Sequence, residues 1–181
     1  MTGAPQTDDA GPLVSVIVPV YNVRDFVSEC LASITAQTHS NMQIIVVDDG
    51  SSDGAGETCD QLAALDARIE VIHQANAGLS GARNAGLDRA AGEYLTLVDG
   101  DDVIAPEFVS RLLADCVSHD ADLAVTGFAT FTGQAPALPV ADEVEVLRTP
   151  EELEQLVTGV PPRWEGPTKL YRAEAFEGLR F

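Results

Sequence analysis

Along the first two thirds of the chain, short apolar runs alternate with longer stretches in which apolar residues are spaced apart. Short apolar runs are typical of strands that are covered on both faces of a sheet. Five such runs occur, at residues 13–19, 42–47, 68–72, 93–98 and 122–126. Longer stretches separate them, in which apolar residues recur at the spacing of an amphipathic helix. These stretches cover residues 23–37, 55–65, 78–91 and 106–119.

This alternation predicts the fold class. Strands that are each followed by a helix join through right-handed crossovers, which gives a mostly parallel sheet. We therefore expect an α/β unit over residues 13–127, with a mostly parallel open sheet and helices on both faces. Residues 1–12 lack the basic and apolar regions of a signal peptide and are predicted to be a disordered polar lead-in.

The pattern is less regular after Gly127. The chain ends on the apolar phrase Leu179-Arg-Phe181 with no polar tail, so we expect residues 128–181 to begin a further portion that stops inside a larger fold. The elements predicted there are an extended loop or hairpin over residues 128–140, an edge strand over residues 143–147 and a helix over residues 149–159.

Polar residues follow three of the predicted strands. Tyr21-Asn22, Asp48-Asp49 and Asp99 to Asp102 each come directly after an apolar run. The carboxyl ends of parallel strands share one edge of the sheet, and ligands of open α/β sheets bind there. The sequence therefore predicts a binding site at this edge. The alternative for Asp48 and Asp49 is that they cap a helix.

Three carboxylates surround one glycine in the last of these clusters, which contains Asp99, Asp101 and Asp102. Like charges this close raise one another's pKa, and a divalent cation with hard oxygen ligands relieves the repulsion. The cluster therefore suggests Mg²⁺ or Mn²⁺, and the alternative is a solvated acidic turn. The glycines after Asn76 form a Gly-x-x-Gly pattern, which does not match the dinucleotide fingerprint.

Charge and composition narrow the class of partner. The chain has 181 residues with 10 Lys and Arg against 29 Asp and Glu, a net charge of −19. Such a balance argues against binding to nucleic acid or to an anionic membrane surface, and no apolar run is long enough to span a bilayer. Three cysteines, Cys30, Cys59 and Cys116, lie in predicted helices without zinc spacing, and are predicted to be buried or half-buried free thiols in a reducing cytoplasm. The three histidines show no partner spacing and are predicted to be structural or on the surface.

Four segments resemble the large family-two glycosyltransferases, which are inverting nucleotide-sugar enzymes of the GT-A fold, a Rossmann-like α/β fold. The resemblance runs from about Leu13 to Thr126 and resumes weakly at Lys169-Leu-Tyr171. The four segments are Val14-Ser-Val-Ile-Val-Pro-Val-Tyr-Asn22, Ile45-Val-Val-Asp-Asp-Gly-Ser-Ser-Asp53, Gly78-Leu-Ser-Gly-Ala-Arg-Asn-Ala-Gly86, and Gly92-Glu-Tyr continued by the DXD-type motif Asp99-Gly-Asp-Asp102.

The resemblance implies a role for each motif residue. Tyr21 would pack its ring on the nucleobase, and Asp49 would accept a hydrogen bond from the base, typically uracil. Arg83 would face the diphosphate unless it pairs with a nearby acid. Asp101 would bind the metal ion directly, Asp99 would touch the ribose or a metal-bound water, and Asp102 would either support these or cap a helix. The residues that it assigns to the nucleotide sugar are Pro19, Tyr21, Asn22, Asp49, Arg83, Asp99 and Gly100, and those that it assigns to Mn²⁺ or Mg²⁺ are Asp101 and Asp99.

The implied reaction moves a sugar from a nucleotide diphosphate, such as a UDP-sugar, to a saccharide or lipid-linked acceptor with inversion. By resemblance this belongs to cell-envelope polysaccharide synthesis in the cytoplasm, at the inner membrane face if further segments anchor it. No residue matches the family's general base, and nothing aligns Asp142 or Glu143 with that role. A nucleotide-sugar-binding module without turnover therefore stays open. An aspartate-dependent phosphotransfer protein is disfavoured, because the first strand ends in Pro-Val-Tyr-Asn and Val103 replaces the threonine of the phosphatase motif.

Overall fold

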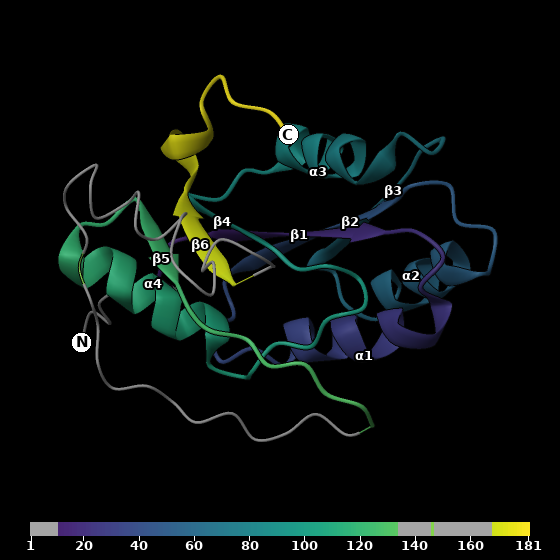
Figure 1. Ribbon diagram of the computed structural model, residues 1–181, viewed down its shortest axis with the longest axis horizontal. Helices are drawn as coiled ribbons and strands as arrows, with labels where there is room; N and C mark the ends of the chain where they lie inside the picture. The colour runs from purple at the N-terminus through teal and green to yellow at the C-terminus, as the bar shows by residue number, and fades with distance from the viewer. Residues whose placement is uncertain (1–10, 134–145, 147–167) are drawn as a thin grey trace, which may run out of the picture.

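A computed structural model describes residues 11–133, 146 and 168–181 of the chain. Within that part a six-stranded sheet lies between helices (Figure 1). Its strands are β1 (Val14–Val20), β2 (Met42–Asp48), β3 (Ile69–His73), β4 (Tyr94–Leu97), β5 (Leu123–Val125) and β6 (Lys169–Arg172). Its helices are α1 (Arg24–Thr35), α2 (Ala55–Ala63), α3 (Gly78–Arg89), α4 (Phe108–His119) and the 3-10 turn η1 (Ala173–Phe176).

The nine elements predicted up to residue 126 are all present, with ends that shift by one to three residues in most cases. α4, for example, starts two residues after Pro106. The predicted edge strand over residues 143–147, except Val146, and the predicted helix over residues 149–159 lie outside the described residues. None of the helices in the described part is long and apolar enough to cross a bilayer.

The order of strands in the sheet is β3-β2-β1-β4-β6-β5. β1 to β4 pair in parallel, as the alternation of strands and helices predicts. β6 is antiparallel to both β4 and β5, so it separates the fifth predicted strand from the fourth. The sequence did not predict this strand. A four-residue segment carries little periodic signal, and its position between β4 and β5 depends on pairing with residues more than 40 positions away.

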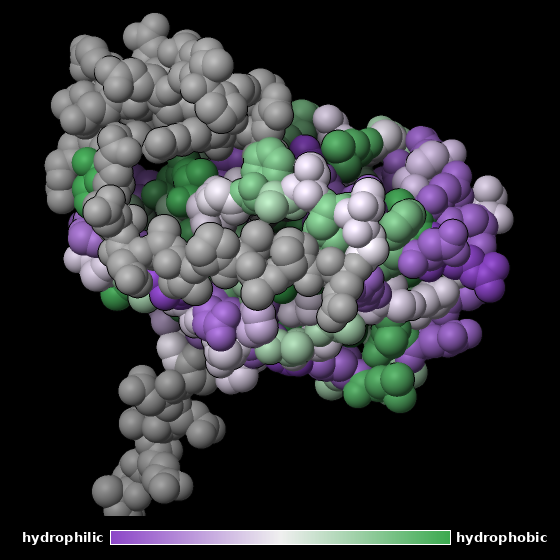
Figure 2. All heavy atoms as spheres, turned by 60° about the horizontal axis from the view of Figure 1, so that its bottom comes forward, coloured by the Kyte–Doolittle hydropathy of each residue, from purple (hydrophilic) through white to green (hydrophobic). Residues whose placement is uncertain are grey.

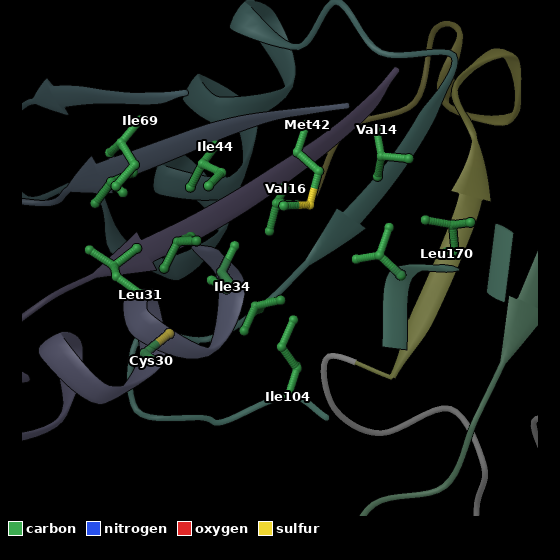
Figure 3. Packing of buried hydrophobic residues seen from close by; sticks show 14 of the residues in the cluster. Val14, Val16, Cys30, Leu31, Ile34, Met42, Ile44, Ile69, Ile104 and Leu170 are labelled. Carbon is green, nitrogen blue, oxygen red and sulfur yellow. The ribbon is translucent and has the colours of Figure 1, made fainter. Parts of the chain in front are cut away.

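Two apolar layers hold the helices to the sheet. On one face, residues of β1, β2 and β4 pack against α1, α2 and α4, and Figure 3 shows this cluster from close by. On the other face, Ile17, Ile45 and Leu97 pack beneath α3, which lies above the sheet in Figure 1 on the same side as η1 and the C-terminal segment. Side chains of these strands are almost fully buried. Each such Val or Ile contributes about 1.5–3 kcal/mol on the transfer scale.

Gly86 lets α3 approach the sheet closely. A Cβ atom placed at Gly86 would collide with the side chain of Ile17 on β1, so only a glycine permits this helix–strand distance. The approach matters for the candidate site, because Arg83 stands on the same helix one turn earlier.

The prediction that the three cysteines are free thiols inside the fold is confirmed. Cys30, Cys59 and Cys116 are free thiols and all are buried, in α1, α2 and α4 respectively. Burial, with some repulsion from nearby aspartates, raises the pKa of Cys30 to about 12, so this thiol stays protonated and packs as a small apolar side chain.

Candidate functional site

A cavity of about 380 Å³ opens at the carboxyl ends of β1, β2 and β4. Its volume falls within the range of small-molecule sites. Tyr21, Asp49 and Asp101, which the sequence places at the ends of three different strands, all line it. The other lining residues are Pro19, Val20, Val23, Asn76, Gly78, Leu79, Ala82, Asp99 and Gly100.

The turn after β1 presents Tyr21 at the mouth of the cavity, where the residue is 52% exposed. Asn22 follows in the left-handed conformation, with φ of 53°. Its Oδ1 accepts hydrogen bonds from the backbone N (2.8 Å) and hydroxyl (3.4 Å) of Ser52, and its backbone N donates to Ser51 Oγ at 3.2 Å. Asn22 therefore joins the turn after β1 to the turn after β2, and it does not line the cavity itself.

Asp49 is only 2% exposed, and its carboxylate is already engaged. Oδ1 accepts hydrogen bonds from Gln74 Nε2 at 2.6 Å and from Ala77 N at 2.8 Å, and Oδ2 accepts one from Gly78 N at 2.9 Å. The carboxylate thus covers the amino end of α3, as the capping alternative predicts, although for a helix further along the chain. A carboxylate has about four acceptor positions, so one remains on Oδ2 beside the cavity.

Asp48 lies below Asp49 and is paired with His73. His73 Nδ1 lies 2.9 Å from Asp48 Oδ2, and His73 Nε2 lies 3.1 Å from Asp60 Oδ1. Although burial opposes the change, hydrogen bonds from Ser51 and His73 lower the pKa of Asp48. Hydrogen bonds to Asp48 and then to Asp60 raise the pKa of His73. Sequence spacing did not predict these partners, which are 25 and 13 residues away.

Arg83 forms an ion pair with Asp99, with 3.0 Å between Nη2 and Oδ1, which is the alternative that the sequence left open. Its guanidinium also lies over the ring of Phe181, 5.3 Å from the ring centroid. The Nε–H group of Arg83 is buried, and no described residue accepts a hydrogen bond from it. A buried unpaired donor is costly, so this N–H is suited to an incoming anion.

The acidic loop after β4 meets the carboxyl end of β1 at Gly100. The Gly100 backbone N donates to Pro19 O at 3.2 Å, and a Cβ at this position would lie 3.0 Å from the same oxygen. The absence of a side chain therefore allows the loop to approach the strand closely at one wall of the cavity. Asp99 and Asp101 flank this contact on the cavity side.

Asp102 does not cap a helix, because α4 begins only at Phe108; the helix-capping alternative for this residue is wrong. Burial and repulsion from Asp101 and Asp99 raise the pKa of its carboxyl to about 6. Within residues 11–133 and 168–181, no three His, Cys, Asp or Glu side chains are arranged around a common metal position. One or two carboxylates suffice where phosphates complete the coordination of Mg²⁺, and both Asp99 and Asp101 line the cavity.

Some residues near the site were not predicted. Asn76 and Leu79 line the cavity from the start of α3. Lys169 on β6 is 8% exposed, and burial and then the charge of Arg83 lower its pKa. Asn76 lies two residues before the motif that starts at Gly78, which was the available signal. Lys169 begins the phrase at which the family resemblance resumes, but that phrase does not predict its nearness to Arg83, which depends on where β6 enters the sheet.

Comparison with known proteins identifies the family. Residues 15–179 match the family model described as Glycosyl transferase family 2. EpsJ of Bacillus subtilis, an uncharacterized glycosyltransferase, is 42% identical over 170 residues, which are 92% of this chain and 49% of the relative. Glycosyltransferase GlyA of Streptococcus pneumoniae is 39% identical over 180 residues, covering 93% of this chain and 25% of the relative.

A solved structure shares the fold. Residues 1–349 of S. aureus TarS superpose with a TM-score of 0.74 at 26% identity, over 91% of this chain and 48% of that one, and TarS has also been crystallised with UDP and with UDP-GlcNAc. The present chain spans half or less of the length of these proteins. The matched family model, the relatives and the shared fold show that the chain belongs to glycosyl transferase family 2.

Proposed function

We propose that this chain binds a nucleotide-diphosphate sugar, most simply a UDP-sugar, in the cavity at the carboxyl ends of β1, β2 and β4, as part of an inverting glycosyltransferase. The observation that supports this most is the convergence of Tyr21, Asp49 and Asp101 on one cavity. TarS, which shares the fold at 25–26% identity, binds UDP and UDP-GlcNAc.

The nucleoside end of the donor would lie against the turn after β1. Tyr21 has an exposed ring at the mouth of the cavity, and stacking on such a ring suits a nucleobase. Pro19 forms part of the same wall. The acceptor position that remains on Asp49 Oδ2 suits a base N–H, which agrees with uracil.

The diphosphate end would lie between the acidic loop and α3. A protein with a net charge of −19 repels a polyanion, so the site needs local cations. Arg83 supplies one beside Asp99, and Asp101 with Asp99 would hold Mn²⁺ or Mg²⁺ against the phosphate oxygens. A bound divalent ion would act as a Lewis acid that stabilises the leaving diphosphate.

The transfer itself would be a single displacement, in which an acceptor hydroxyl attacks the anomeric carbon from the face opposite the diphosphate. This inverts the configuration and requires a general base within hydrogen-bond reach of that hydroxyl. No described residue is assigned to that role. We propose that residues 13–127 form the donor half and that residues 128–181 begin the acceptor half, with a saccharide or lipid-linked acceptor used in cell-envelope polysaccharide synthesis at the cytoplasmic membrane face.

A second candidate function is donor binding without turnover. The observation that favours it is length, because this chain corresponds to 25% of GlyA and 49% of EpsJ. In that case binding would be retained and transfer would need residues that this chain does not contain.

Two measurements on residues 1–181 test the proposal. Thermal unfolding with UDP, GDP, CDP and ADP, each with and without Mn²⁺, should show the largest rise in melting temperature for UDP with Mn²⁺, because a ligand of the folded state alone stabilises it. Incubation with UDP-sugars and saccharide acceptors then separates the candidates. Transfer with inverted product indicates the full enzyme, and binding without released UDP indicates the donor-binding unit. No stabilisation by any nucleotide would overturn both.

A further inference from the structure

His73 has a carboxylate at each ring nitrogen. Nδ1 is 2.9 Å from Asp48 on β2, and Nε2 is 3.1 Å from Asp60 on α2. His73 itself ends β3. One side chain therefore connects two strands and a helix, and Asp48 directly precedes Asp49, which lines the candidate cavity. Neither the family resemblance nor the mechanism proposed above uses this residue.

The contact of His73 with Asp48 continues to the Tyr21 turn. The other oxygen of Asp48 accepts a hydrogen bond from Ser51 N at 2.9 Å. Ser51 Oγ in turn accepts a hydrogen bond from the backbone N of Asn22 at 3.2 Å. Asn22 directly follows Tyr21, which lines the cavity and whose ring is proposed to stack on the nucleobase. Three hydrogen bonds thus lead from the imidazole to the residue after the stacking tyrosine.

The residue after His73 contacts both aspartates at the end of β2. Gln74 donates its backbone N to Asp48 O at 3.0 Å and its side-chain Nε2 to Asp49 at 2.6 Å. The imidazole is half exposed, and on its α2 side a Cβ at Gly56 would collide with Asp48 and lie 3.4 Å from His73 Cε1. The imidazole therefore has a defined position between the β2 turn and the β3 turn.

Protonation decides how many of these contacts the ring can make. A neutral imidazole donates through one nitrogen, whereas an imidazolium donates through both. The charged groups that face the ring are Asp48 from β2 and Asp60 from α2, and these raise the pKa of His73 above its ordinary value of about 6.5. The Cys59 thiol on α2, which interacts with the same two carboxylates, stays neutral because burial raises its pKa to about 12.

We propose that His73 is a positioning residue of the nucleotide cavity, which in its doubly donating form holds Asp48 and Asp60 together and so keeps the Ser51, Asn22 and Tyr21 turn in place for the nucleobase. The inference rests on the proposed function of the cavity. Loss of the proton releases one of the two carboxylates, loosens this turn and weakens nucleotide binding.

The test compares the affinity of residues 1–181 for UDP with Mn²⁺ at pH 6.5 and at pH 8.5 by calorimetry. For each variant we compare the dissociation constant at pH 8.5 with that at pH 6.5, as a ratio. Titration of the ligand and of the acidic loop affects this ratio equally in all variants. In the unmodified chain, we expect the ratio to exceed that of His73→Lys by about threefold, the low end of the effect of one intramolecular hydrogen bond. Lysine keeps its charge at both pH values.

Three further variants complete the design. His73→Gln should show the same ratio as His73→Lys, with weaker binding at pH 6.5 than the unmodified chain. His39→Gln, the matched control on a histidine that contacts Pro12 O, should keep the unmodified ratio. Asp60→Asn removes one of the two carboxylates that face His73, at an exposed position. UDP binding should then weaken at a lower pH than in the unmodified chain. This variant keeps the test valid if His73→Gln folds poorly.

Each outcome decides between two statements. The role of His73 would be overturned if the unmodified chain, His73→Gln and His73→Lys gave equal ratios. It would also be overturned if UDP binding weakened at the same pH in Asp60→Asn as in the unmodified chain. Either result would leave the cavity as the nucleotide site. If the unmodified chain binds no UDP at either pH, the proposed function of the cavity fails instead.

Discussion

At the scale of single residues, the candidate site consists of side chains whose charges are largely neutralised by near neighbours. Asp49 is held by the start of α3, Asp48 by His73, and Asp99 by Arg83. Asp101 lines the cavity on the same acidic loop. Under the proposed function, Asp101 is the carboxylate that would bind a cation arriving with the diphosphate.

Replacing Asp101 with asparagine tests this assignment. We expect Asp101→Asn to weaken UDP binding on the order of tenfold or more in Mn²⁺, an effect of the size seen when metal-site residues are altered, and to leave binding in EDTA little changed. Calorimetry with and without Mn²⁺ measures both. Glu29→Gln removes the same charge from an exposed position on α1 and serves as the control. An equal loss in EDTA would show that Asp101 acts through something other than a metal ion.

The pair formed by His73 and Asp48 also makes stability depend on pH. Because the pKa of His73 is raised in the folded state, its contribution to the free energy of unfolding is complete below about pH 6.5 and is lost as the pH rises through the raised pKa. The side chain is half exposed, so solvent screening limits the effect to about 0.5 kcal/mol. Urea unfolding should show the unmodified chain gaining this much over His73→Gln at pH 5.5 relative to pH 9. A constant difference would contradict the prediction.

At the scale of elements, the position of α3 determines the geometry of the site. This helix carries Arg83, and its first backbone N–H donates a hydrogen bond to Asp49. It also contributes Leu79 and Ala82 to the cavity. It lies on the face of the sheet opposite α1 and α2, on the same side as η1 (Figure 1). Its distance from β1 is set where Gly86 meets Ile17.

Adding one methyl group at that contact should separate the two elements. We expect Gly86→Ala to destabilise the fold by about 1–3 kcal/mol, as overpacking does, because the new Cβ would collide with Ile17. Gly127→Ala is the matched control, since a Cβ there meets nothing within 4 Å. Chemical denaturation of both variants measures the difference. Equal stability of the two variants would mean that α3 moves freely enough to accommodate the methyl group.

At the scale of the whole molecule, excess negative charge acts on stability and on ligand approach. The net charge is −19 over 181 residues. Figure 2 shows hydrophilic residues concentrated at the right-hand end of the described part, which is the end where β1 to β3 finish in Figure 1. Net charge of this size opposes the compact state through self-repulsion.

Salt should therefore stabilise the fold. Raising NaCl from about 20 to about 200 mM shortens the screening length from roughly 20 Å to below 10 Å, and we expect the melting temperature to rise by a few degrees. Differential scanning calorimetry without divalent ions gives the measurement, and a sodium sulfate series matched in ionic strength separates screening from specific ion effects. A flat or falling melting temperature would indicate that local ion pairs outweigh the overall repulsion.

The sequence by itself determined the order and type of the elements up to residue 126, and it placed Tyr21, Asp49 and Asp101 at one edge of the sheet. Both follow from local information, since helix and strand periods are written in neighbouring residues and parallel strands all end on the same side. Only the tertiary structure decided that β6 enters the sheet between β4 and β5, that His73 meets Asp48 and Asp60, and that Arg83 pairs with Asp99. These contacts join residues far apart in the chain, and their formation depends on sheet order and helix packing, which no local pattern encodes.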